Sequence, residues 1–133
     1  MNPAGGTLVL DSQGLSGWLA EDRRVMTLLA AGHRSGADVA ASAMTILEAA
    51  HRGVRQRRLD WVLSRLRVEP VTQAAVRAAA RLLLDAGLHG HAHAIDAVVA
   101  ELAARLTAPV ALVTSDPGDM RRLCPAHVRI VAI

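Results

Sequence analysis

Hydrophobic and polar positions follow two distinct periods along this chain. Short apolar runs recur, each bounded by glycine, proline or polar residues, which is the pattern of buried β-strands. Longer stretches with apolar residues at helical spacing separate these runs. Strands that alternate with helices predict an α/β fold, a three-layer α/β/α sandwich with a mainly parallel central sheet. The predicted strands are residues 7–11, 38–43, 68–71, 110–114 and 128–133, the third interrupted by Pro70.

Capping signals set the expected limits of the helices. Thr72 is placed to cap a long helix, and Gly87 to end it, since glycine is favoured just after a last helical turn. Gly32 is placed to end a helix over residues 22–31 in the same way. The other predicted helices are one through Trp18 and Leu19 and those over residues 45–57, 59–66, 92–106 and 117–123.

Length and composition favour a single folded domain. The chain has 133 residues, of which 52% are hydrophobic, so a substantial core is expected. Residues 7–133 are expected to form this domain, after a flexible N-terminal lead-in over residues 1–6. No uncharged apolar stretch approaches the roughly 18 residues of a membrane-spanning helix. The lead-in lacks a basic region and an apolar signal core, and Cys124 is the only cysteine, so we expect a cytoplasmic protein without disulfides.

The charged residues exclude two common functions of α/β proteins. All 15 basic residues are arginine, and lysine is absent. A P-loop and a phosphoacceptor receiver domain each need a lysine near a strand end, so neither fits. The formal net charge is +3, and arginines gather between residues 52 and 67. Such a block forms either a solvated helix face or a surface that contacts phosphate groups.

Four acidic residues lie just past or just within apolar segments: Asp11, Glu48, Asp96 and Asp116. In an open α/β sheet the carboxyl ends of the strands lie along one edge, where ligands bind. Carboxylates that reach this edge can converge although they lie far apart in sequence. A cluster of hard oxygen ligands is what Mg²⁺ or Mn²⁺ prefers. The sequence therefore predicts a metal site as well as a fold.

Three of these acids also have structural interpretations as helix caps. Asp11 and Asp116 each precede a predicted helix, whose first backbone N–H groups need acceptors. Asp96 has this interpretation only if its helix starts later than predicted. On the predicted helix it points away from Glu101 and Arg105, which mark the expected solvent stripe. A lone carboxylate on a packing face carries a desolvation cost unless something compensates it.

Glu48 has the strongest structural alternative. With Thr45 it matches a capping box, in which the glutamate returns to the backbone of the cap residue. On the predicted helix it also shares one face with Arg52 and Arg55. An ordinary surface ion pair would then explain it.

Three histidines, His89, His91 and His93, alternate in the segment before Asp96. This pattern holds Zn²⁺ when it lies on a strand, but here it falls in a predicted loop. No second cluster completes a tetrahedral site, so a zinc site is disfavoured. His93 lies three residues before Asp96 and is placed to approach the same crevice.

The order and spacing of the acidic motifs resemble those of the PIN-domain ribonucleases, in particular the VapC toxins of bacterial toxin–antitoxin pairs. The resemblance covers nearly the whole chain. The segments that carry it are Leu8-Val9-Leu10-Asp11-Ser12, Thr45-Ile46-Leu47-Glu48, Ile95-Asp96-Ala97-Val98-Val99-Ala100 and Leu112-Val113-Thr114-Ser115-Asp116. Each motif is short, but their order, their spacing and the total length are together fairly specific.

The resemblance implies a compact α/β/α fold whose acidic quartet binds Mg²⁺, for which Mn²⁺ can substitute, and cleaves single-stranded regions of RNA. The implied ligands are Asp11, Glu48, Asp96 and Asp116. Asp119 falls where some members have an additional acid, which supports the site or replaces a ligand. The pair Pro117-Gly118 departs from the family, whose members often have an arginine or another polar residue there. The resemblance also implies a cognate antitoxin protein and a homodimer.

We therefore expect an endoribonuclease that cleaves phosphodiester bonds with a metal-activated water. Asp11, Asp96 and Asp116 are expected to bind the main ion, with Glu48 holding a water or a second ion. Ser115 or Thr114 is placed to orient the attacking water. Arg52 and Arg55 are the candidates for contacts with flanking phosphates.

Two alternatives stay open at this point. One is a catalytically inert module of the same fold that binds RNA or a protein partner. The other is a DNA nuclease, because the same metal chemistry cleaves both polymers.

Overall fold

The central element is a five-stranded sheet in which all four pairings are parallel. The structure is a computed structural model that describes residues 5–133. The strand order is β3-β2-β1-β4-β5, so β1 lies in the middle. The prediction of a mainly parallel sheet is confirmed. The strands are β1 (Thr7–Leu10), β2 (Asp38–Ser42), β3 (Arg67–Glu69), β4 (Val110–Thr114) and β5 (Val128–Ala132).

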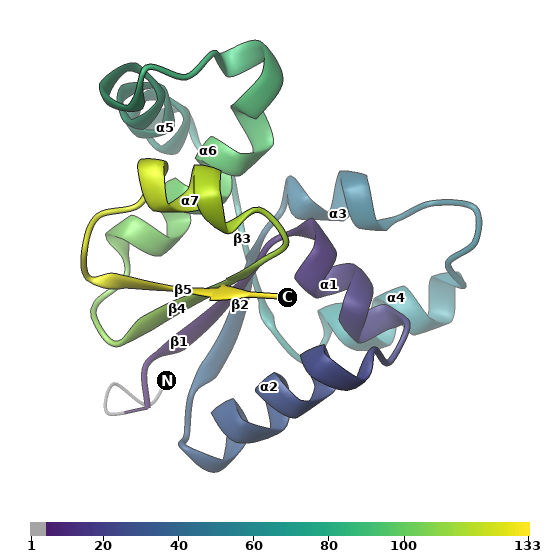
Figure 1. Ribbon diagram of the computed structural model, residues 1–133. Helices are drawn as coiled ribbons and strands as arrows, with labels where there is room; N and C mark the ends of the chain where they lie inside the picture. Colours follow the sequence, from purple (N-terminus) through teal and green to yellow (C-terminus); the bar gives the residue numbers. More distant parts are fainter. Residues whose placement is uncertain (1–4) are drawn as a thin grey trace.

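Helices cover both faces of this sheet, which confirms the predicted α/β/α sandwich (Figure 1). Four helices, α1 (Ser12–Leu19), α2 (Arg23–Arg34), α3 (Thr45–Ala49) and α4 (Gln56–Leu63), lie on one face. The other face carries α5 (Gln73–Ala86), α6 (Gly90–Arg105) and α7 (Pro117–Leu123).

Side chains of the central strands point alternately to the two faces of the sheet, and this divides the hydrophobic core into two parts. Val9 of β1 pairs in register with Leu112 of β4, and both pack against α6. The next pair, Leu10 and Val113, points to the opposite face and packs against α1. Successive strand residues point to opposite faces, so each strand contributes to both cores. Each such fully buried side chain contributes about 1.5–3 kcal/mol to stability.

The predicted helix over residues 45–57 is wrong. The helix α3 ends at Ala49, and α4 begins at Gln56 and ends at Leu63, earlier than the predicted 59–66. The intervening loop contains Gly53, whose backbone N–H donates to Nδ1 of His51 at 3.1 Å. Glycine disfavours a helix by about 1 kcal/mol, and a side chain that takes the backbone N–H competes with helical hydrogen bonds.

Two other predicted boundaries are also corrected. The helix α2 does not end before Gly32 but continues to Arg34. Gly32 lies inside the helix and does not end it. A Cβ at this position would approach Cδ1 of Leu8 to 2.5 Å, so glycine is needed here for close packing of α2 against β1. The strand β3 ends at Glu69, so Pro70 follows it and does not interrupt it.

The start of the chain is described from Gly5 onward, and the expected lead-in lies partly outside the described residues. Gly6 has φ +72° and accepts a hydrogen bond from the Asp38 N–H at 3.0 Å. A Cβ added to Gly6 would meet the carbonyl oxygen of Pro109. The division into a lead-in, residues 1–6, and a domain, residues 7–133, stays a prediction.

A pair of glycine substitutions separates steric contact from backbone strain. Gly6 and Gly87 both have positive φ, but no atom lies within 4 Å of a Cβ built on Gly87. Gly87→Ala is expected to cost about 1–2 kcal/mol, the strain of a left-handed residue. Gly6→Ala is expected to cost clearly more, because a backbone carbonyl must also move. Urea denaturation of both variants measures the difference, and equal losses would contradict the packing of Gly6.

Candidate active site

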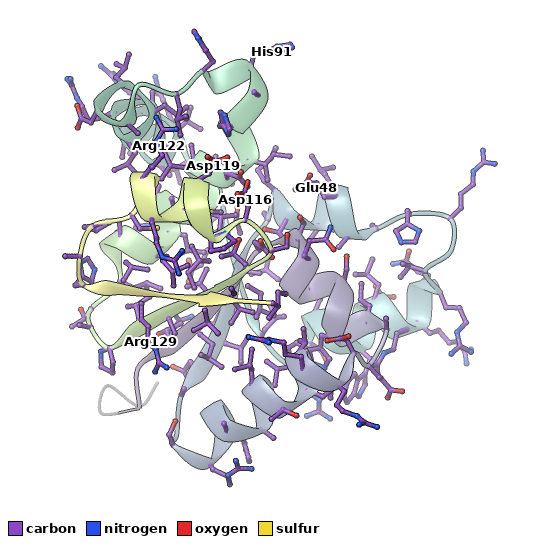
Figure 2. The ribbon with its side chains drawn as sticks, viewed as in Figure 1. Glu48, His91, Asp116, Asp119, Arg122 and Arg129 are labelled. Carbon is purple, nitrogen blue, oxygen red and sulfur yellow. The ribbon has the colours of Figure 1, made fainter. Side chains whose placement is uncertain are left out.

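The topology brings two of the predicted acids to one place. The chain leaves β1 for β2 on one side, and later returns to β4 on the other side of β1. At such a switch point the connections diverge and leave a crevice at the carboxyl ends of the strands. Asp11 follows the last residue of β1, and Asp116 lies two residues beyond the end of β4. Figure 2 shows Glu48, Asp116 and Asp119 near this edge, where α3 and α7 begin.

Asp11 connects two parts of the crevice and is buried. Its Oδ1 accepts the Gly14 N–H at 2.8 Å, so the predicted cap of α1 is confirmed. Its Oδ2 accepts the Ser115 N–H at 3.1 Å, from the turn after β4. A carboxylate oxygen can accept more than one hydrogen bond or ligand, so each oxygen keeps a free lone pair. Asp11 is thus both a helix cap and an acid held in a fixed orientation.

Asp116 occupies the N-cap position of α7, but its side chain makes no capping hydrogen bond, so its predicted capping role is wrong. Its backbone N–H donates to Oγ1 of the buried Thr114 at 2.9 Å. Pro117 occupies the start of the helix, where no N–H is needed. The exposed carboxylate of Asp116 therefore lies in a turn whose backbone is fixed by Thr114 and by the bond from Ser115 to Asp11.

Glu48 lies in the first turn of α3, and its two structural alternatives are wrong. Met44 is the N-cap residue, and no side chain caps this helix, so Thr45 and Glu48 form no capping box. Because α3 ends at Ala49, Glu48 shares no helix face with Arg52 or Arg55, which lie exposed in the following loop. The structure therefore leaves the exposed Glu48 side chain without the structural role that its sequence context predicts.

Asp96 lies within α6, three residues after the kink at His93, and the N-cap residue of α6 is His89, so the N-cap alternative for Asp96 is wrong. The expected solvent stripe is also wrong in part. Glu101 is buried, and its carboxylate pairs with Nε of Arg105 at 3.1 Å. A Glu–Arg pair four residues apart has the same sequence signature whether it is exposed or buried.

The pKa of Asp96 depends on burial and on the charges of the other three predicted acids. Its pKa is raised from 3.8 to about 6, first by burial and then by the charges of Asp116, Asp11 and Glu48. His93 acts in the opposite direction and lowers this pKa. Like charges disfavour one another's ionised forms only at short range, so the side chains of these acids lie near Asp96. A bound cation would compensate the same repulsion.

The histidine segment is helical, so the predicted loop is wrong. His89 is the N-cap residue of α6, and His91 is exposed on the first turn, which extends away from the sheet (Figure 2). His93 is half-buried, and its Nδ1 lies 3.4 Å from Oδ2 of Asp119. Ligand atoms of His93, Asp96 and Asp119 lie within 4.8 Å of one another. The sequence reasoning missed this pairing, although the spacing of His93 and Asp96 placed them on one side of a helix.

Two larger hollows of the surface lie away from the acidic quartet. One, of about 880 Å³, lies between α2 and α4 and is bordered by Trp18, Met26 and Trp61. The other, of about 550 Å³, lies beside α1 and is bordered by His51 and Arg55. Neither lining includes a member of the quartet, so size alone does not identify the chemical site.

Comparison with known proteins identifies the fold. No family model and no curated protein sequence matches the chain. Its structure is similar to a chain in the crystal structure of VapBC2 from Rickettsia felis bound to a DNA fragment from their promoter. The TM-score is 0.70 and the identity 17%, over 96% of this chain and 98% of that chain. The chain therefore shares the fold of a chain in the VapBC2 structure.

The helices of residues 5–133 do not have the properties of membrane spans. None of them combines the length and the apolar character that crossing a bilayer requires.

Proposed function

We propose that this protein is a metal-dependent endoribonuclease that acts as the toxin of a toxin–antitoxin pair. The observation that carries the proposal is the proximity of Asp11, Glu48 and Asp116 to Asp96, whose pKa is raised first by burial and then by the charges of these three acids. Convergence of four acids from separate parts of the chain is costly unless it serves a cation. The fold shared with a VapBC2 component supports the same assignment.

The side chains of Asp11, Asp96 and Asp116 fit a divalent ion such as Mg²⁺, or Mn²⁺ in its place. Their donors are carboxylate oxygens, the ligands that both ions prefer. The Asp116 carboxylate makes no capping bond, and Asp11 keeps free lone pairs beside its two backbone donors. We assign Asp11, Asp96 and Asp116 as the ligands of the main ion. Glu48, in the first turn of α3, is assigned to hold a water or a second ion.

The chain's own residues orient the reactants. When bound, a divalent ion supplies activation of a water molecule and neutralisation of charge on the phosphate. Thr114 and the Ser115 N–H hold the turn that presents Asp116, and the exposed Ser115 side chain is the candidate for orienting the water. The exposed Arg52 and Arg55 supply positive charge for flanking phosphates of a single-stranded RNA.

The pKa of Asp96 makes ion binding pH-dependent. Because this pKa is raised to about 6, a proton competes with the ion below that pH. Saturating Mn²⁺ is expected to raise the Tm of the protein strongly at about pH 7.5 and much less at about pH 5. Differential scanning fluorimetry at both pH values measures this. A Tm that Mn²⁺ leaves unchanged at the higher pH would favour the inert module that binds RNA or a protein.

The choice of polymer is tested separately. Equal amounts of a single-stranded RNA and a single-stranded DNA of the same sequence are offered together to the protein with Mn²⁺. Preferential loss of the RNA is expected. Preferential loss of the DNA would replace the ribonuclease by a DNA nuclease, with the acidic site unchanged.

The partners follow from the same proposal. The solved neighbour is VapBC2 bound to promoter DNA, which supports a cognate antitoxin as a partner of this chain. We propose that this antitoxin covers the acidic site. We also propose that the protein forms a homodimer and acts in the cytoplasm. Sedimentation of the purified chain tests the dimer, for which a single species of about 28 kDa is expected, twice the 14.0 kDa of one chain.

A further inference from the structure

A histidine joins the acidic site where α6 is kinked. His93 has φ −123° and ψ 20°, outside the helical region, although the helix continues on both sides. Across the packed helices, its imidazole lies beside Asp119 in the first turn of α7. Asp96 lies three residues after His93 on α6. One nitrogen ligand and two carboxylates thus meet from two helices.

The spacing of these side chains fits one small cation. Bonds of about 2.0–2.2 Å to a metal place neighbouring ligand atoms about 3.0–3.5 Å apart. The nitrogen–oxygen distance from His93 to Asp119 is 3.4 Å, and Asp96 completes a set within 4.8 Å. The side chains of His93 and Asp119 are 24% and 27% exposed, so an ion can enter and keep water ligands.

The kind of ligand decides which ion fits. Mg²⁺ favours oxygen ligands and binds imidazole poorly, whereas first-row transition metals accept nitrogen. We infer that His93, Asp96 and Asp119 form a second cation site, beside the site of Asp11 and Asp116, and that this second site binds Mn²⁺ in preference to Mg²⁺. The binding itself is independent of RNA, and only its role in cleavage rests on the proposed function.

Asp96 connects the two sites. Its pKa is raised by burial and by the charges of Asp116, Asp11 and Glu48 and lowered by the charge of His93, so Asp96 lies near both groups of side chains. A carboxylate has two oxygens and can bridge two ions. The all-carboxylate site accepts Mg²⁺ or Mn²⁺, and the site with the imidazole discriminates between them.

A purely structural pair between His93 and Asp119, tying α6 to α7, is the competing explanation. Such a pair contributes to stability but does not affect Mn²⁺ affinity in the presence of Mg²⁺. The two explanations therefore differ in a direct binding measurement.

The experiment titrates Mn²⁺ into the purified full chain with saturating Mg²⁺ present and follows free Mn²⁺ by electron paramagnetic resonance. The wild-type protein is expected to retain a Mn²⁺ site that Mg²⁺ does not displace. His93→Ala is expected to weaken this site by at least about tenfold. His91→Ala, which removes an exposed imidazole from the same helical turn, is the matched control and leaves the affinity unchanged.

A second variant keeps the test decisive if His93→Ala perturbs folding. His93→Gln retains an N–H donor for Asp119 but lacks the imidazole nitrogen, and circular dichroism checks its fold. The same loss of Mn²⁺ affinity is expected. Wild-type affinity in a folded His93→Gln protein would overturn the inference while leaving the ribonuclease proposal intact. Mn²⁺ binding as expected without any RNA cleavage would instead reject the ribonuclease and retain the site.

Discussion

Replacing Asp96 with asparagine is expected to abolish RNA cleavage and, at the same time, to raise the Tm of the metal-free protein. Cleavage should fall by about 10³-fold or more, equivalent to ~4 kcal/mol of transition-state stabilisation. Asparagine has nearly the same shape but lacks the negative charge, which burial disfavours most and which Asp116, Asp11 and Glu48 also repel. Because solvent screens part of this repulsion, we expect a gain of a few degrees, about 4 °C for each 1 kcal/mol relieved.

The pH dependence of this gain has a definite sign. The folded pKa of Asp96, about 6, exceeds its unfolded value, so the folded state retains the proton to higher pH. The wild-type protein therefore loses stability relative to Asp96→Asn as pH rises from about 4 through 6. Thermal melts in EDTA at about pH 5 and about pH 7.5 should show a small and a larger difference, respectively.

Asp85→Asn is the matched control, because Asp85 is an exposed carboxylate on α5. It should leave both cleavage and Tm close to wild type. An Asp96→Asn protein that is less stable than wild type in EDTA would contradict the repulsion inferred from the pKa. One that still cleaves RNA would remove the quartet from the mechanism.

Replacing Asp11 with alanine is expected to abolish cleavage and to lower stability, the opposite sign from Asp96→Asn. The substitution removes a metal ligand, the cap of α1 at Gly14 and the bond to the Ser115 N–H. Loss of a cap costs about 0.5–2 kcal/mol, and the unpaired Ser115 N–H adds to this cost. Urea denaturation and a cleavage assay measure the two effects.

Asp22→Ala separates these effects, because Asp22 caps α2 through the Val25 N–H at 3.1 Å and lies outside the quartet. It should cost a similar free energy of unfolding but leave cleavage intact. Retained cleavage in a folded Asp11→Ala protein would reduce Asp11 to a helix cap and exclude it from the metal site.

The sheet and its acidic edge could be predicted from sequence because both follow from local patterns. Apolar runs identify strands, and parallel strands bring their carboxyl ends to one edge, so the pattern alone places Asp11 and Asp116 at that edge. The break after Ala49 could not be predicted, since Glu48, Arg52 and Arg55 also fit one helix face. In this segment the low helix propensity of Gly53 and the hydrogen bond from its N–H to the His51 side chain outweigh the helical spacing of the charged residues.

The contact between His93 and Asp119 could not be predicted from the sequence for a different reason. His93 and Asp119 belong to separate helices, and their contact depends on how α6 packs against α7. The kink at His93 also has no signature in the sequence, which contains no proline near it. The prediction that Glu101 faces solvent fails for a related reason, because a Glu–Arg pair four residues apart is typical of an exposed helix face although Glu101 is buried.

The most direct test of the central claim is cleavage of a mixed RNA pool by the purified protein. The reactions contain Mg²⁺ or Mn²⁺, EDTA in place of the ion, or Asp96→Asn in place of the wild-type chain. We predict discrete RNA products with either ion, and none with EDTA or with the variant. Products that form equally in EDTA, or equally with Asp96→Asn, would contradict a metal-dependent ribonuclease built on this acidic quartet.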